Sequence, residues 1–224
     1  MMRVAAYWAP RIDDPLHALG SAWLGRDAET GATVPQPALP GLDIAEVTAD
    51  ARGYGLHATL KPPFRLATSW QAFRADAMAL AARTRPFALP PLRLMEHHGF
   101  LALMESEKSG DLQAFCDACV TALDTHRAPP TEAEIARRNP ARMTARQREH
   151  LARWGYHYVL DEWWFHVTFS RRLSAEERAV VQPALAAHLG DVPALPRRVT
   201  ELCLFTQAAP GAPFLVAERL SLLG

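Results

Sequence analysis

The chain has 224 residues, of which 49% are hydrophobic, so it can bury a sizeable core and an intrinsically disordered chain is excluded. Its 24 Lys and Arg residues balance its 24 Asp and Glu residues, which excludes a broad positive field for holding long nucleic acids but leaves a small anionic ligand possible. Three cysteines and an N-terminus without an apolar secretory core favour a cytoplasmic protein, and no apolar run approaches the roughly 18 residues of a membrane span.

The first half of the chain is predicted to alternate between strands and helices. Hydrophobic periodicity predicts strands over residues 3–8, 54–64, 87–94 and 99–105, the last two as a hairpin, and helices over residues 15–24, 70–83 and 110–125. Residues 44–51 are expected to form one or two helical turns, and the proline-containing stretch 30–41 is expected to be a surface loop. Pro62 and Pro63 should end the strand over residues 54–64.

The second half begins with a segment of different composition, residues 127–153, which holds seven arginines and three acidic residues. Capping-box pairs within it predict two short helices, one opened by Thr131 with Glu134 and one by Thr144 with Gln147. A strand is expected over residues 164–170, then a helix opened by Ser174 and interrupted at Pro183, then strands over residues 199–206 and 214–222. This order predicts an α+β fold with mainly antiparallel sheets.

Two tetrapeptides share one pattern of His, apolar, Thr, apolar: residues 57–60 (HATL) and residues 166–169 (HVTF). Side chains alternate across a strand, so the histidine and threonine of each copy should share one face while the apolar residues point to the other. Composition alone predicts roughly 0.2 such matches in this chain. The pair is therefore informative, and two copies 109 residues apart are expected if each half of the chain lays one strand against a shared cleft.

The duplicated motif resembles that of the 2H phosphoesterase superfamily, which is named for two His-Φ-Ser/Thr-Φ motifs. Residues 54–64 (YGLHATLKPPF), 23–31 (WLGRDAETG) and 153–156 (RWGY) resemble more specifically its branch assigned to phosphonate metabolism. The resemblance implies a bilobal α+β fold in which two mainly antiparallel sheets flank a central cleft with helices outside. The whole chain, 1–224, would form one bilobal domain, with lobes near 1–125 and 160–224 joined by the arginine-rich segment 127–158.

The resemblance also implies a metal-independent cyclic phosphodiesterase that needs no cofactor and acts on a small phosphorylated sugar or nucleotide. His57 and His166 would be the acid and base, because imidazole titrates near neutral pH and can take either role. The hydroxyls of Thr59 and Thr168 would donate hydrogen bonds to the nonbridging phosphate oxygens. The two motifs are locally alike, so the sequence does not assign acid and base individually.

Three further residues are candidates for substrate binding, each with a structural alternative. Lys61 follows Thr59 by two positions and would hold a phosphate from the same face, unless it is a surface lysine at the strand end. Ser170 occupies the matching place in the second strand, where a turn residue is the alternative. Tyr7 would face the cleft and stack on a base or sugar, or else pack at an edge or in the core.

Other patterns leave the function open. The arginine-rich segment is either a set of solvated helical faces or an electropositive lid over a phosphorylated substrate. Cys116 and Cys119 have the spacing of half a zinc site, but they lie on an apolar helical stripe, and the remaining histidines lack metal-ligand spacing, so no metal site is predicted. An enzyme that processes RNA ends (2′,3′-cyclic phosphodiesterase or 2′,5′-RNA ligase) and a noncatalytic module that binds a phosphorylated metabolite are the alternative functions.

Overall fold

The computed structural model describes residues 2–224, and antiparallel strands and α-helices alternate along them, which confirms the α+β class. The strands are β1 (Arg3–Trp8), β2 (Ala58–Arg65), β3 (Phe87–Leu89), β4 (Leu92–His97), β5 (Phe100–Glu105), β6 (Val167–Thr168), β7 (Arg197–Val199), β8 (Glu201–Gln207) and β9 (Leu215–Ser221). The α-helices are α1 (Pro15–Leu24), α2 (Ile44–Val47), α3 (Ala49–Tyr54), α4 (Trp70–Arg83), α5 (Gly110–Ala122), α6 (Glu132–Arg137), α7 (Ala145–Trp154) and α8 (Ala175–Leu189).

Seven of the strands form one sheet in the order β4-β5-β6-β2-β1-β8-β9, in which every neighbouring pair is antiparallel. The resemblance implied two mainly antiparallel sheets that flank a cleft; instead, the short strand β6 pairs with both β5 and β2 and joins strands from both halves of the chain into one continuous sheet. The second sheet is a small one, β3 with β7. The large sheet interleaves the two expected lobes, because β8 and β9 from the C-terminal part lie beside β1.

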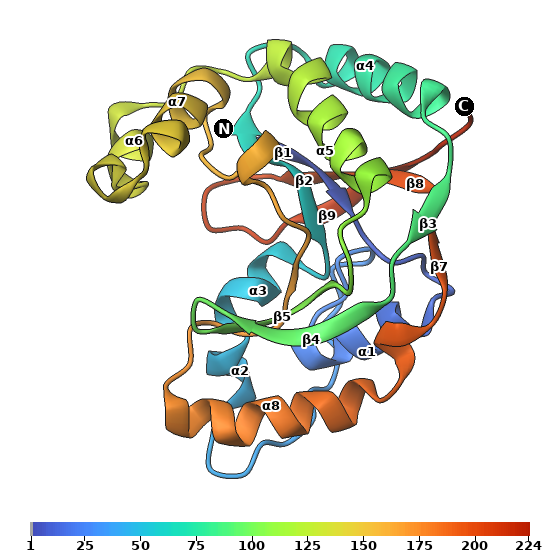
Figure 1. Ribbon diagram of the computed structural model, residues 1–224, viewed down its shortest axis with the longest axis vertical. Helices are drawn as coiled ribbons and strands as arrows, with labels where there is room; N and C mark the ends of the chain where they lie inside the picture. Colours follow the sequence, from blue (N-terminus) through green and yellow to red (C-terminus); the bar gives the residue numbers. More distant parts are fainter. Residues whose placement is uncertain (1) are drawn as a thin grey trace.

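Helices cover the sheet in two groups (Figure 1). Helices α4 and α5 pack together, α5 against β2 and α4 against β8 and β9, while α1 and α8 pack against each other at the other end of the molecule. Helices α6 and α7 stand apart from both groups, beside the amino end of β1. No helix among residues 2–224 combines the length and the apolar character needed to cross a bilayer.

Strand β1 is buried on both of its faces, which explains its continuous apolar sequence. Val4, Ala6 and Trp8 belong to the main core, under the helices. Ala5 and Tyr7 point the other way, into a smaller cluster with Cys203, Phe205 and Phe214 from β8 and the segment before β9. Because side chains alternate along a strand, this second cluster lies on the opposite face of the sheet.

The helix ends follow the sequence closely. Thr131, Thr144 and Ser174 each form the predicted capping box, with Glu134, Gln147 and Glu177 respectively. The predicted interruption at Pro183 is wrong, since α8 continues through it. Proline removes one backbone donor, but Val181, Leu185 and Leu189 remain buried on the packed face of α8 and hold the helix together.

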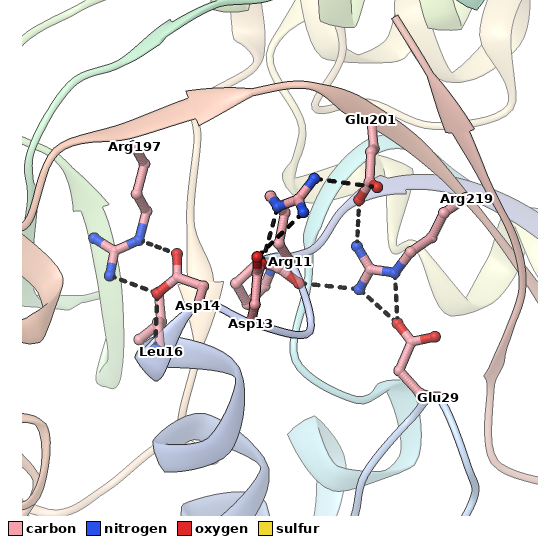
Figure 2. A network of polar contacts seen from close by, with 9 residues as sticks. Arg11, Asp13, Asp14, Leu16, Glu29, Arg197, Glu201 and Arg219 are labelled. Atoms are coloured by element: carbon pink, nitrogen blue, oxygen red, sulfur yellow. Dashed lines mark hydrogen bonds and ion pairs between the residues drawn. The ribbon is translucent and has the colours of Figure 1, made fainter.

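Ion pairs fasten the loops that leave β1 (Figure 2). Arg219 on β9 binds Glu29 and Glu201, and Arg11 pairs with Asp13 and approaches Glu201. Farther along, Arg197 binds the carboxylate of Asp14, which also accepts the Leu16 backbone N–H at the start of α1. Every arginine in this network has a carboxylate partner, so its charge is neutralised within the fold.

Candidate active site

The two His-x-Thr motifs lie on neighbouring strands at the centre of the sheet. Strands β2 and β6 are antiparallel, with Ala58 directly opposite Val167. This register puts His57 opposite Thr168 and Thr59 opposite His166, all four on one face. Directly opposite residues have Cβ atoms about 4.5–5.5 Å apart and diagonal ones about 7–8 Å apart. The two histidines are thus placed diagonally across the strand pair.

Both imidazole rings are held by the same kind of backbone contact. Nδ1 of His57 lies 2.9 Å from the carbonyl oxygen of Gly55, and Nδ1 of His166 lies 3.1 Å from that of Trp164. A carbonyl oxygen only accepts, so Nδ1 carries the proton in the neutral ring and donates it to that oxygen. Nε2 is then left with its lone pair in both histidines, ready to accept a proton.

The backbone before His57 depends on a glycine. Gly55 has φ of +82°, and a Cβ atom built on it would lie 2.5 Å from the Cβ of Ala28. Any other residue would therefore be strained and would push the turn away from the loop that carries Ala28. This turn ends α3 and presents the Gly55 carbonyl to the His57 ring.

Aromatic rings shield the two histidines from water. Tyr7 packs on His57 with ring centroids 4.0 Å apart, and Trp164 stacks on His166 at 5.3 Å. Burial lowers the pKa of His57 from 6.5 to about 4, more than the Gly55 contact raises it, and His166 lowers it further. Burial also lowers the pKa of His166. Both rings are therefore mainly neutral at pH 7.

The threonines complete the polar face. Oγ1 of Thr59 lies 3.3 Å from Nε2 of His57, and the backbone carbonyl of Thr59 accepts a 2.8 Å hydrogen bond from Nε1 of Trp163. A cavity of about 230 Å³ opens over this face, and Tyr7, His57, Thr59 and Thr168 are among the residues that line it. His166 is not part of that lining; its ring packs beside Trp164 and Phe100.

The expectation that Lys61 shares the face of His57 is wrong. Tyr7 pairs with Thr59 but Ala6 pairs with Lys61, so β2 holds one extra residue at this point and the alternation is reversed beyond it. Lys61 therefore points to the other face of the sheet, which α5 covers, and is 2% exposed. Its ammonium group donates to the backbone carbonyl of Val120 (2.8 Å) and to Asp124 (3.0 Å). A second register shift follows, and it lets β2 run through Pro62 and Pro63, where the sequence predicted its end.

Ser170 is also turned away from the cleft. Strand β6 ends at Thr168, and the Ser170 hydroxyl, itself buried, accepts a 2.9 Å hydrogen bond from the backbone N–H of Leu101. Its expected place beside His166 and Thr168 is therefore wrong, because its oxygen secures the edge of β5 instead. Tyr7, by contrast, does line the cleft, although its side chain is fully buried among aromatic neighbours.

Sequence reasoning missed several residues that line this cavity. Arg3, Tyr54, Arg138 and Tyr156 all contribute to its wall. Arg3 could have been found, because it shares the strand alternation of Tyr7 on β1. Tyr156 and Arg138 come from the segment 127–158, whose position relative to the sheet no local pattern reveals.

The cysteines pack in the core, and two arginines of the arginine-rich segment form ion pairs. Cys116 and Cys119 are buried on α5, and the thiol of Cys116 donates to the Leu60 carbonyl, so the core-packing interpretation is confirmed. Within residues 2–224, no group of three or more His, Cys, Asp or Glu side chains is arranged to hold a metal ion. In the arginine-rich segment, Arg127 and Arg146 are paired with carboxylates.

Comparison with known proteins identifies relatives. A family model described as "Protein of unknown function (DUF1045)" matches residues 59–215. A protein of Janthinobacterium sp. (strain Marseille) named ribose 1,5-bisphosphate phosphokinase PhnN is 35% identical over 236 residues, which cover 100% of this chain and 51% of that protein. A protein of the same name from Laribacter hongkongensis (strain HLHK9) is 34% identical over 226 residues, 99% of this chain and 52% of its own. The chain spans about half the length of these curated relatives.

Proposed function

The chain belongs to the DUF1045 family, and from this premise we propose that it is a metal-independent cyclic phosphodiesterase of the 2H type. Its substrate would be a small phosphorylated sugar or nucleotide. The observation that carries the proposal is the arrangement of His57 and His166, which share the same Nδ1–carbonyl contact and sit diagonally on paired strands, each opposite a threonine.

In this mechanism the phosphorus atom lies between the two histidines. One neutral imidazole takes a proton from water through Nε2 as the water oxygen attacks phosphorus. The other, as imidazolium, protonates the sugar oxygen whose bond to phosphorus breaks. The products are a phosphomonoester and a free hydroxyl, and the proton taken by one ring balances the proton given by the other. Thr59 and Thr168 would donate hydrogen bonds to the nonbridging oxygens, where negative charge grows.

The depressed pKa values suit this role once substrate is bound. In the free protein, two neutral rings avoid the cost of burying a positive charge in the cleft. An anionic phosphodiester brings negative charge between the rings and raises the pKa of both, so that one ring becomes the cation that the acid step requires. Substrate binding and proton uptake would then be coupled.

The phosphokinase name of the relatives is compatible with this proposal. The familiar phosphate-binding loop of nucleotide-dependent kinases, G-x-x-x-x-G-K-[ST], requires a Gly-Lys pair, and this chain has none: Leu60 precedes Lys61 and Glu107 precedes Lys108. We therefore assign the phosphokinase activity to the half of those proteins that this chain does not match. Opening a cyclic phosphate on a ribose that already carries a phosphate would yield a ribose bisphosphate, the kind of molecule in that name. Together with the resemblance of residues 54–64 to the phosphonate-metabolism branch, this supports a role in phosphonate metabolism.

The test is hydrolysis of a panel of 1,2- and 2′,3′-cyclic phosphates of ribose and nucleosides, with EDTA present. The proposal expects turnover by the wild-type protein and losses of roughly 10²- to 10⁴-fold in His57→Ala and His166→Ala, each of which should remain folded. Activity that survives both substitutions, or that disappears with EDTA, would refute the mechanism. An RNA oligonucleotide with a 2′,3′-cyclic end belongs in the panel, since faster turnover there would overturn the assignment of a small substrate.

A further inference from the structure

A second cavity adjoins the cavity over His57. This cavity, of about 300 Å³, lies against α6 and α7 and extends from the amino end of β1. It shares Arg3, Tyr54 and Arg138 with the lining of the first cavity, so the two cavities adjoin at these residues. A substrate held beside His57 would meet the arginine-rich segment at Arg138, where the two cavities adjoin.

Arginines with no carboxylate partner stand where the two cavities meet. The side-chain hydrogen bond of Arg3 is to the neutral amide of Gln207, at 2.7 Å. Arg137 and Arg138, at the end of α6, are exposed, and the guanidinium of Arg138 lies 4.6 Å from the ring centre of Tyr156. Among residues 2–224, no carboxylate lies within 4.0 Å of these three guanidinium groups. They differ in this from the neutralised arginines of Figure 2.

The acids in the same walls do not cancel this charge. Glu134 also lines the second cavity, but it is held by Arg65 and by the backbone N–H of Thr131. Lys61 and Arg127 also line the second cavity, and both pair with Asp124. Asp50 lines the first cavity and is exposed to solvent. The junction therefore keeps a net positive charge in a chain whose overall formal charge is zero.

The hydroxyl of Tyr7 supplies a second, independent observation. Its side chain is 0% exposed, it lines the first cavity, and its hydroxyl oxygen is buried with no hydrogen-bond partner. Buried polar groups are normally satisfied, so an unpartnered one beside a cavity indicates a ligand contact. Burial raises the pKa of Tyr7 well above 10, so the hydroxyl keeps its proton and can donate it; Tyr54, Arg3 and Tyr156 are its charged or ionisable neighbours.

We propose that Arg3 and Arg138, with the hydroxyl of Tyr7, bind a second phosphate of the substrate, a monoester that takes no part in the reaction. The proposal rests on the proposed function, which supplies the diester held at His57, and it narrows the substrate class to cyclic phosphodiesters that carry a remote phosphomonoester. A phosphate dianion suits this site because arginine forks match its oxygens in pairs and the neutral hydroxyl adds a directed donor. The exposed side chain of Arg137, which lines the second cavity, would add electrostatic attraction.

The test compares cyclic phosphates of ribose offered in pairs, with and without a phosphate on C5, by the ratio of their kcat/KM values. The wild-type protein should prefer the phosphorylated member roughly 10- to 100-fold, because that ratio corresponds to the free energy of hydrogen bonds to a charged group. Arg138→Ala should lower the ratio about tenfold or more. Arg142→Ala is the matched control, because Arg142 is an exposed arginine of the same segment that lines neither cavity. It should keep the wild-type ratio.

Calorimetric binding of ribose 5-phosphate and of ribose, at one ionic strength, separates this proposal from the proposed function. Tighter binding of ribose 5-phosphate that is lost in Arg138→Ala and kept in Arg142→Ala supports the phosphate site even if no cyclic phosphate is hydrolysed. Hydrolysis with a ratio near one in the wild-type protein and no preference for ribose 5-phosphate would overturn the site while leaving the phosphodiesterase intact. Equal losses in both arginine variants would also overturn it, since they would indicate only a general electrostatic field.

Discussion

Acid should destabilise this protein in part through His57. Burial lowers its pKa from 6.5 to about 4, so between these values the unfolded chain binds more protons than the folded one, and stability falls as the pH falls. The contribution is negligible at pH 7, grows below pH 6.5 and levels off below about pH 4. At pH 5 the two pKa values correspond to a loss of about 2 kcal/mol relative to pH 7.

The measurement is urea unfolding of the wild-type protein and of His57→Gln at pH 7 and pH 5, in buffers without phosphate because a bound anion would raise the histidine pKa. Other histidines with a lowered pKa, including the half-buried His157 at about 4, contribute equally to both proteins. The free energy of unfolding should therefore drop by about 2 kcal/mol more in the wild type than in the variant. Equal drops would refute the reasoning that burial keeps His57 neutral.

Three more predictions follow from the site and its support. Asp124→Ala should lower the free energy of unfolding by about 3–5 kcal/mol in urea, because it leaves the buried ammonium group of Lys61 without its carboxylate partner. Lys61→Met should cost less stability and keep kcat/KM, and a large loss of kcat/KM in this variant would contradict its place on the face opposite the histidines. Tyr7→Phe should leave the melting temperature equal or higher while weakening ribose 5-phosphate binding; lower stability with unchanged binding would show a structural hydroxyl. The pH profile of kcat/KM should peak below pH 6.5, since both free-enzyme histidines titrate below their usual value, and a profile rising to pH 8 would exclude them as the acid–base pair.

The sequence predicted that the two His-x-Thr motifs lie on strands with one polar and one apolar face, because that part depends on local periodicity. The alternation of His, apolar, Thr, apolar places two residues on each face of a strand wherever the strand lies, and the burial of Ala58 and Val167 follows it. Capping boxes are equally local, and all three formed. The joining of the strands into one sheet depends on β6, only two residues long, whose two partners are distant in the chain. No periodicity in the sequence could reveal that pairing.

The errors at the site have physical causes of the same kind. Lys61 would have faced the cleft in a regular strand, but an extra residue in β2 turned it under the sheet, where Asp124 and the Val120 carbonyl compensate its charge. A register shift shows only in the pairing with β1. Arg138 could not be singled out from the sequence because its segment holds many arginines. Which of them are paired with carboxylates, as Arg127 and Arg146 are, depends on tertiary contacts.

The most direct test of the central claim is kcat/KM for the best-hydrolysed cyclic phosphate in four proteins: wild type, His57→Ala, His166→Ala and the double variant. If the two rings act on one phosphate as a unit, each single variant should lose at least about 100-fold, and the double variant should be little worse than the poorer single one. Wild-type turnover in either single variant, with both still folded, would contradict the account.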